Sequence, residues 1–446
     1  MENNRNNNKF WKGVLVGALV MAFAGLIIVG FSAGIFLIGR TVIDSQVQTQ
    51  QLEDDVSGEG AGLELERIAS KMELIQQIVG KYFLFDEDMK DVEDGIYTGL
   101  MYGLNDPYSV YYNEDAYNSL KEDTAGVYCG IGAMVSQQRS TGIITVSKVF
   151  EGAPAFDAGM LPGDILYKVD DVAVTSMDLD LVISEHIRGE EGTFVPITVL
   201  RGENNDEVEL KVERRQVVVP TVEYQMLEDN VGYIYIMQFD TVTSEQFKEA
   251  VDDLESQGME KLMVDLRDNP GGVLDSVVEM LAYILPEDEH DGLLLYTSDK
   301  DGKGDRYFSK NGKLQCTSDF DTVNSSYPKD DDHELDMPMA ILVNGNSASA
   351  SEVFTGTMMD YDRAVVVGTQ TFGKGIVQNL IPLGDGTAVK LTTSHYYTPS
   401  GFDLHKVGLK PDVEIDLDDE LKKKAVVPLE EDNQVLKALE VLKEKQ

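Results

Sequence analysis

The chain has 446 residues, of which 37 are basic and 79 acidic, so its formal net charge is −42. This length predicts two or three domains, because single hydrophobic cores stop growing beyond about 300 residues. The acidic surface argues against nucleic acid and anionic lipid headgroups as partners of the soluble part. Two cysteines, Cys129 and Cys316, cannot supply a disulfide framework, and whether they pair with each other stays open.

An uncharged apolar run over 14–39 is long enough to cross a bilayer as a helix. Arg5, Lys9 and Lys12 precede this run and acidic residues follow it, so the positive-inside rule predicts a cytoplasmic N-terminus over 1–13. A cleavable signal is the alternative, but the run is too long for one and no small-residue cleavage site ends it. We therefore expect a single-pass protein of the cell membrane whose remaining chain is extracytoplasmic.

The next two segments are predicted to be a linker and a helical region. Residues 40–62 are polar and punctuated by glycine, which is typical of a linker. Apolar residues at spacings of three and four then predict a helix over about 63–85, and a second helix is expected near 89–102. We therefore expect a small N-terminal helical region over 63–125.

Short β-type runs separated by glycine, proline and aspartate dominate 126–214, with one helix expected at about 177–187. This pattern predicts a compact β-rich domain. Its segment YCGIGAMVS, at 128–136, is similar to the loop with which peptide-binding β-domains capture the terminal carboxylate of a chain. Gly130 and Gly132 would expose the backbone N–H groups that bind this anion.

Strands alternate with helices over 215–416, which implies an α/β layer architecture. Strands are expected at 231–239, 261–268, 339–344 and 364–369, and helices at 244–257, 274–285 and 347–361. The insertion 287–336 combines a hairpin-like piece with an acidic tract, for which a solvated loop is favoured over a cation site. The tail, 417–446, contains an amphipathic helix that we expect to dock on a neighbouring element or on a second chain.

Three serines at alternate positions, Ser347, Ser349 and Ser351, follow a predicted strand and begin a predicted helix. The carboxyl edge of an open α/β sheet usually holds the ligand site. A nucleophile in the first helical turn would meet the positive end of the helix dipole and a backbone N–H suited to an oxyanion. From this segment alone, however, a helix cap at Ser347 is the favoured interpretation.

A serine nucleophile needs a base, for which His395, His405 and Lys374 are candidates. The sequence around the serines contains no G-x-S-x-G elbow, which weakens a histidine triad. Lys374 lies between two glycines, and burial would lower its pKa from the ordinary value of about 10.4. Serine–lysine pairs are a known alternative to the triad. The segment DLRDNPGG, at 265–272, is explained equally well by an anion-binding nest and by a turn.

Seven motifs follow one another along the chain: LNDPYSVYY, YCGIGAMVS, VFEGAPAFDAGMLPGDILYKVDDVAV, IRGEEGTFVPITVLR, DLRDNPGGVL, LVNGNSASASEV and GTQTFGKGIVQ. Their order resembles that of the carboxyl-terminal processing peptidases, also called tail-specific proteases, over about 63–416. The resemblance implies an α/β protease core over 215–416 behind a PDZ domain over 126–214. It also implies an endopeptidase that needs no cofactor or metal and binds protein substrates with apolar C-terminal tails.

The resemblance also implies the roles of individual residues. Ser349 would be the nucleophile, Lys374 the general base and Gln378 the residue that orients the lysine. The oxyanion hole would combine backbone N–H groups of Ala350 and of either Gly271 or Gly272.

The resemblance further implies that the loop of Gly130, Ile131 and Gly132 binds the substrate's C-terminal tail. Arg188 is a candidate for coupling this tail binding to the active site. The sequence departs from the family pattern in Tyr108, where histidine is more usual, and in the long acidic segment 287–336. The alternative function is a membrane-anchored PDZ scaffold without peptidase activity. Physiological substrate and homo-oligomer formation stay open.

Overall fold

The computed structural model describes residues 63–444 apart from 86–87, 139, 288, 311–312, 321–324, 329–332 and 425. The membrane helix predicted at 14–39 and its flanks, 1–13 and 40–62, therefore lie outside the described residues. Within the described residues, no helix has the length and apolar character needed to cross a membrane. The chain divides into two compact units.

The two units are defined by their residues and are kept under these names below. The first unit holds the described residues of 63–119, 286–332 and 373–408. The second unit holds those of 120–285, 333–372 and 409–446. Each unit is assembled from segments that are far apart in the sequence.

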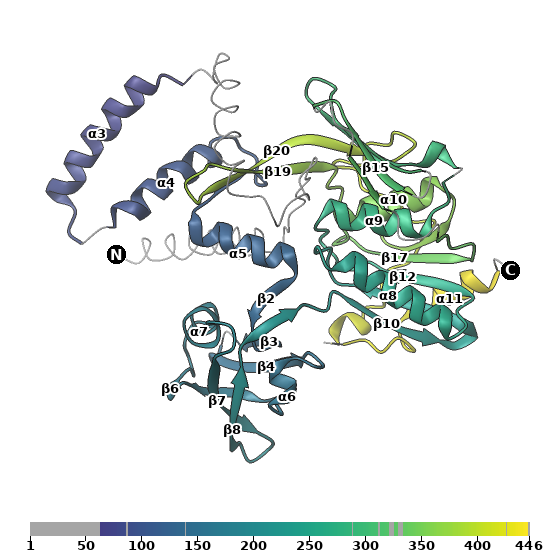
Figure 1. The fold of residues 1–446 in the computed structure, drawn as a ribbon, viewed down its shortest axis with the longest axis horizontal. Coiled ribbons are helices and arrows are strands. Elements are labelled where there is room, and N and C mark those ends of the chain that lie inside the picture. Colours follow the sequence, from purple (N-terminus) through teal and green to yellow (C-terminus); the bar gives the residue numbers. More distant parts are fainter. Residues whose placement is uncertain are drawn as a thin grey trace. The chain divides into compact units, whose positions relative to one another are not determined.

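The first unit combines helices with one antiparallel sheet (Figure 1). Its helices are α3 (Leu65–Tyr82), α4 (Met89–Tyr102) and the first half of α5 (Glu114–Ala125). The sheet has the strand order β1-β20-β13-β14-β15-β16, and β19 also pairs with β20. The strands are β1 (Val110–Tyr112), β13 (Leu293–Asp299), β14 (Asp305–Ser309), β15 (Lys313–Ser318), β16 (Ser325–Pro328), β19 (Ile376–Pro382) and β20 (Ala388–Tyr397).

The segment 287–336 is more regular than the hairpin-like insertion that its sequence predicted. It contributes strands β13 to β16, which pair in antiparallel succession. Strand β13 also pairs with β20, with Tyr296 opposite Tyr397. This pairing joins segments far apart in the chain, so local periodicity could not reveal it.

The second unit contains the expected β-rich domain. Strands β3 (Ala133–Gln138), β4 (Ile143–Val149), β5 (Ile165–Val169), β7 (Phe194–Arg201) and β8 (Asp206–Glu213) form one sheet, with β6 (Val172–Ala173) paired to β5. Strands β2 (Val127–Gly130) and β9 (Arg215–Val218) pair separately. The domain also holds α6 (Pro154–Asp157) and α7 (Leu179–Val182), which continues as a π-helical turn to Ile187.

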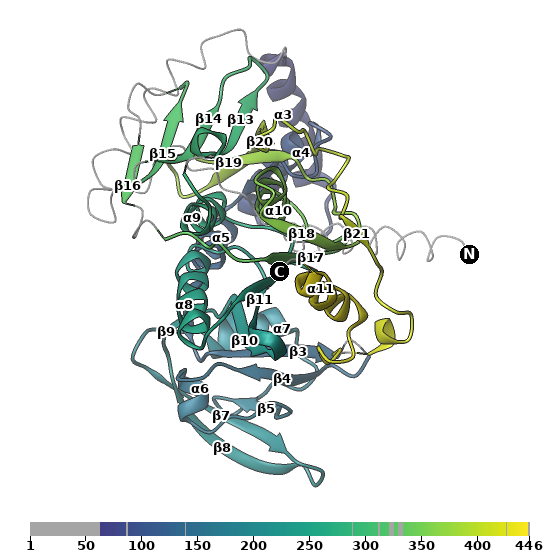
Figure 2. The ribbon, with the colours of Figure 1, turned by 90° about the vertical axis from the view of Figure 1, so that its right-hand side faces the viewer.

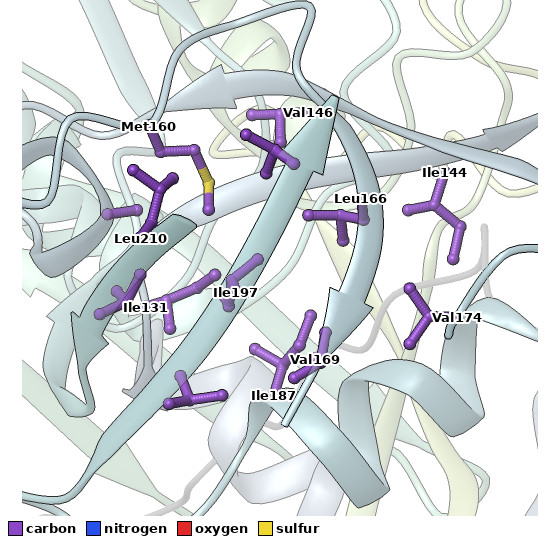
Figure 3. Packing of buried hydrophobic residues seen from close by; sticks show 14 of the residues in the cluster. Ile131, Ile144, Val146, Met160, Leu166, Val169, Val174, Ile187, Ile197 and Leu210 are labelled. Atoms are coloured by element: carbon purple, nitrogen blue, oxygen red, sulfur yellow. The ribbon is translucent and has the colours of Figure 1, made fainter. Parts of the chain in front are cut away.

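The core of this β-rich domain is a single apolar cluster. Figure 3 shows Ile131, Ile144, Leu166, Val169 and Ile197 gathered between its strands and helix. In β7, alternate residues are buried, because successive side chains of a strand point to opposite faces. The first strands and the last strands of the domain therefore depend on the same core.

The rest of the second unit is a mainly parallel sheet with helices on both faces. Its order is β10-β11-β12-β17-β18-β21, in which only β10 is antiparallel to its neighbour. The strands are β10 (Val222–Leu227), β11 (Val231–Ile236), β12 (Lys261–Asp265), β17 (Met339–Val343), β18 (Ala364–Gly368) and β21 (Val413–Glu414). The helices are α8 (Thr243–Ser256), α9 (Leu274–Ile284), α10 (Ala350–Asp360) and α11 (Asn433–Glu444).

Helix α11 shows where the C-terminal tail docks. Its Val435, Ala438 and Leu442 share an apolar cluster with residues of β11, β12, β17 and β18. Figure 2 shows α11 on the side of the sheet away from α8 and α9. Strands β12 and β17 are buried along their whole length, as expected for a parallel sheet covered on both faces.

We predict that Leu166→Ala destabilises the β-rich domain by about 2–5 kcal/mol, because the side chain is fully buried and its removal leaves a cavity. Chemical unfolding of the full chain, followed by hydrogen exchange of the domain, measures this effect. Leu161→Ala is the matched control, because Leu161 is 49% exposed. Equal stability of both variants would contradict the assignment of this core.

Candidate active site

The segment between β17 and α10 holds Ser349 in an unusual backbone conformation. Its φ is 61° and its ψ is −117°, a region that residues other than glycine rarely adopt. Because of this turn, α10 begins at Ala350 and not at 347, where the sequence predicted it. Ser349 is 0% exposed, and its N–H donates to Oε2 of Glu352 over 2.9 Å. Such strain in native structures clusters at functional sites.

The two flanking serines are committed to structural hydrogen bonds. Ser347 Oγ donates to the Leu266 carbonyl over 2.7 Å and accepts from the Asn344 N–H over 2.9 Å. Ser351 Oγ donates to the Asn269 carbonyl over 3.0 Å. These bonds join the serine segment to the residues that follow β12.

Asn269 organises the segment DLRDNPGG beside the serines. It is buried, its Nδ2 donates to the Ile236 carbonyl over 2.8 Å, and its Oδ1 accepts from the Gly271 N–H over 2.9 Å. Its own carbonyl accepts from the Ala348 N–H over 3.1 Å. Asn269 thus fixes both Gly271 and the serine segment.

The two glycines pack where no side chain fits. At Gly271, whose φ is 101°, a Cβ would lie 2.7 Å from Ser349 Cβ and 2.9 Å from Ala350 N. At Gly272, whose φ is 149°, a Cβ would lie 2.0 Å from the Phe239 carbonyl oxygen. The structure therefore brings Gly271, Ser349 and Ala350 together, as the sequence-based site requires.

Glu352 is a buried residue of this site that the sequence analysis did not single out. Besides the Ser349 N–H, it accepts a hydrogen bond from Thr371 Oγ1 over 2.5 Å, and that hydroxyl accepts from the Leu409 N–H over 2.7 Å. The signal was present, since Ser349 and Glu352 have the S-x-x-E spacing of a capping box. Glu352 holds the first turn of α10 to the segment that follows β18.

Lys374 lies in the first unit and is 4% exposed. Its Nζ is 4.6 Å from the centroid of the Tyr108 ring, so the residue that departs from the family pattern contacts the predicted base. Its backbone is tightly held: the Tyr396 hydroxyl donates to the Lys374 carbonyl over 2.7 Å. A Cβ on Gly373 would lie 2.9 Å from Gly408 N, so glycine is required there.

Gln378 lies on β19 in the same unit and is buried. Its Nε2 is 3.3 Å from Thr392 Oγ1 on β20 and 3.4 Å from the Ile376 carbonyl. Its Oε1 accepts no hydrogen bond within the described part of the chain. That Gln378 orients Lys374 therefore stays a prediction.

The motif around Asp106 adds charge to the surroundings of Lys374. Burial would raise the pKa of Asp106, but hydrogen bonds from Ser109, Thr392 and the Tyr108 N–H, together with the Lys374 charge, hold it below its usual value. Lys390, on β20, is 6% exposed. Burial lowers the pKa of Lys390 to about 8, although the Asp106 carboxylate opposes the shift.

The predicted tail-binding loop is well ordered by backbone contacts. The Ile131 carbonyl accepts from Ala155 N–H over 2.7 Å, and the Ile131 side chain belongs to the domain core. A Cβ on Gly130 would lie 2.4 Å from the Tyr128 ring, and a Cβ on Gly132 would lie 2.3 Å from Ala153 Cβ. Glycine is therefore required at 132, where φ is also 75°, and a side chain at 130 would have to displace the Tyr128 ring.

Arg188, the candidate coupling residue, lies beside this loop. Its Cζ is 5.9 Å from the centroid of the Tyr128 ring. Its guanidinium also pairs with Glu122 of α5 over 2.7 Å. Arg188 thus contacts both the strand that leads into the loop and a helix outside the β-rich domain, and its coupling role stays a prediction.

The alternative base, His395, lies on β20 and is half-buried. Its ring meets that of His405 edge to face, with centroids 5.1 Å apart, and its Nδ1 is 3.4 Å from an Asp403 carboxylate oxygen. Burial lowers the pKa of His405, and the neighbouring His395 and Lys406 lower it further by smaller amounts.

A group of side chains with the spacing of metal ligands lies elsewhere in the second unit, at Asp252, Glu255 and His333. His333 Nε2 is 3.1 Å from Glu255 Oε2, and His333 Nδ1 is 3.1 Å from the Tyr283 carbonyl. Because both ring nitrogens already have protein partners, ordinary hydrogen bonds account for this group.

Comparisons with known proteins agree with this architecture. Residues 230–415 match the model of peptidase family S41, and residues 129–212 match that of a PDZ domain. A probable CtpA-like serine protease of Staphylococcus aureus (strain COL) is 35% identical over 78% of this chain and 64% of that protein. One of Staphylococcus haemolyticus is 34% identical over 77% of this chain and 64% of that protein. The chain thus spans less than two thirds of the length of these curated relatives.

Among solved structures, the photosystem II D1 C-terminal processing protease is 24% identical, with a TM-score of 0.42. The match covers 84% of this chain and 94% of that chain, and at this score it adds nothing about the site. The two domain matches confirm the predicted peptidase core and PDZ domain. The chain therefore contains an S41 peptidase domain that follows a PDZ domain, and it is similar to CtpA-like serine proteases.

Proposed function

We propose that this protein is a serine endopeptidase that recognises the C-terminal tails of protein substrates and cleaves them with Ser349 and Lys374. The observation that carries the proposal is the strained, buried position of Ser349 at the start of α10. Ser347 and Ser351 donate to backbone carbonyls, and the positive φ among the three serines belongs to Ser349.

In the proposed reaction, the neutral amine of Lys374 takes the proton of Ser349 Oγ as this oxygen attacks a peptide carbonyl. The resulting ammonium then protonates the leaving amine, and a new N-terminus departs. Water attacks the acyl-enzyme ester, again with Lys374 as the base. Burial of Lys374 supports this role because a buried amine favours its neutral form.

The oxyanion of the tetrahedral intermediate would be bound by two backbone N–H groups. The Ala350 N–H is at the first turn of α10, where helix N–H groups lack intrahelical acceptors. The Gly271 N–H already donates to Asn269 Oδ1, whereas the Gly272 N–H donates to none of the described residues. We therefore favour Gly272 as the second donor and assign to Gly271 the close packing against Ser349.

We predict that Ser349→Ala abolishes labelling by a fluorophosphonate probe, and that Lys374→Ala slows it by about 10²–10⁴-fold through loss of the general base. Gel fluorescence of the full chain measures the labelling. Ser256→Ala and Lys410→Ala, at exposed positions, are the matched controls.

Two outcomes would contradict this dyad. Labelling that keeps the parent rate in Lys374→Ala but is lost in His395→Asn would point to a histidine-dependent hydrolase. A parent protein that is never labelled would support the alternative of an inactive PDZ scaffold.

For the PDZ domain, we propose that Gly130, Ile131 and Gly132 bind the terminal carboxylate of an apolar substrate tail. We predict that a peptide with an apolar tail binds about 10–100-fold more tightly than the same peptide with a C-terminal amide, because hydrogen bonds to a charged group are lost. Fluorescence anisotropy measures both affinities. Equal binding of the acid and the amide would refute carboxylate capture.

We further propose that 14–39 anchors the protein in the cell membrane, with the N-terminus cytoplasmic and the catalytic part extracytoplasmic. The uncharged apolar composition of this run and the basic residues before it support the proposal. We predict that the full chain stays with the membrane after alkaline extraction, whereas a chain lacking 14–39 is released. Mass spectrometry of the mature N-terminus distinguishes an anchor from a cleaved signal, whose removal would contradict this proposal.

A further inference from the structure

The segment NDPYS, at 105–109, has no role in the reaction proposed above, yet it is bound closely to β20. Asp106 Oδ1 accepts from the Tyr108 N–H over 3.1 Å, and Asp106 Oδ2 accepts from Ser109 Oγ over 2.6 Å. Ser109 Oγ in turn accepts from the Thr392 N–H over 3.0 Å. Strand β1 then continues this contact, with Val110 opposite Lys390. The Asp106 carboxylate is therefore fixed relative to the strand that carries Lys390.

This arrangement gathers one carboxylate and two buried amines within the first unit. Lys374 and Lys390 are 4% and 6% exposed, and each Nζ lies near a tyrosine ring. The Lys374 Nζ is 4.6 Å from the Tyr108 centroid, and the Lys390 Nζ is 5.5 Å from the Tyr112 centroid. The charge of Asp106 acts on both amines, since Lys374 and Asp106 stabilise each other's charged forms and Asp106 favours the ammonium of Lys390.

A carboxylate beside a general-base lysine is unfavourable for its chemistry, because an opposite charge favours the ammonium form. A second cation near the same carboxylate partly cancels the attraction between that carboxylate and the ammonium form of the base. It therefore favours the neutral amine of the base. Lys390 is such a cation, since its pKa of about 8 leaves it mostly protonated near pH 7.

We propose that Lys390 and Asp106 are positioning residues that together set the charge of the Lys374 amine, with Lys390 offsetting the Asp106 carboxylate. This inference rests on the proposed function, in which Lys374 must be neutral to accept the Ser349 proton. It gives the segment NDPYS a role: to hold the carboxylate and the Tyr108 ring against the base.

Two other titratable groups near the cluster, His405 and Tyr112, have pKa values shifted toward their neutral forms. His405, whose N would lie 2.7 Å from a Cβ on Gly375, has a lowered pKa, because burial and then His395 and Lys406 outweigh Asp403 and Asp106. Burial raises the pKa of Tyr112 to about 12. Asp403 and Lys406 act on His405, whereas the charge of Asp106 is the one that acts on Lys390.

The test is the pH dependence of fluorophosphonate labelling, whose rate rises as the base loses its proton. Lys390→Met removes the offsetting cation, so the midpoint should move upward by about one pH unit, with a roughly tenfold lower rate on the acid limb. Asp106→Asn removes the anion that favours the ammonium, so the midpoint should move downward. Lys390→Arg should restore the parent midpoint, and Lys313→Met, at an exposed lysine of the same sheet, should leave it unchanged.

A second readout separates this inference from the proposed function. NMR titration of the full chain with ¹³C-labelled lysine, assigned with Lys374→Ala, follows the Lys374 amine itself. If its titration moves in Lys390→Met while the labelling profile does not, the electrostatic inference stands and the general-base role fails. If neither midpoint moves, or only the plateau rate and the melting temperature fall, the inference is overturned and Lys390 is merely structural.

Discussion

The backbone of Ser349 has a φ of 61°, a conformation that costs a non-glycine residue about 1–3 kcal/mol and persists only where its surroundings hold it. The Glu352 side chain holds its N–H, and Asn269 holds Ala348 and Ser351 on either side. Gly271 completes the enclosure because its position has no room for a Cβ. These contacts converge because β12 and β17 are parallel neighbours whose carboxyl ends meet at one edge of the sheet.

Buried charged side chains also need partners from distant parts of the chain, because burying an unpaired ion costs several kcal/mol of folding free energy. In the second unit, Arg267 binds Asp265 over 2.5 Å and Asp432 over 2.8 Å, which joins the end of β12 to the segment before α11. Burial would lower the pKa of Arg267, but the two carboxylates outweigh burial and hold the pKa above its ordinary value. In the first unit, Asp106 is shared between Lys374 and Lys390. The ion pairs of Arg267 join two segments of the fold. The charges around Asp106, in contrast, surround Lys374, whose proposed role as a base requires the neutral amine.

Local patterns predicted much of the peptidase core. Helices α8 and α9 lie within one residue of their predicted ranges at both ends, because their apolar periodicity stops at clear boundaries. Strand β17 was recognisable as a short, wholly apolar run. The strands of 287–336 were underestimated, since their pairing to β20 depends on residues far along the chain. Lys390 gave no signal at all, because its burial follows from β1 and β20 coming together.

The sequence by itself determined the element types and the motif order, and through these the resemblance to a known family. Periodicity and turn residues act over a few neighbouring positions, so they can be read without knowing the fold. Only the tertiary structure decided which serine is strained, which glycine N–H is already bound and which carboxylate acts on the charges of the buried lysines. These features depend on hydrogen bonds and desolvation between segments that are distant in sequence, and no local pattern encodes such distances.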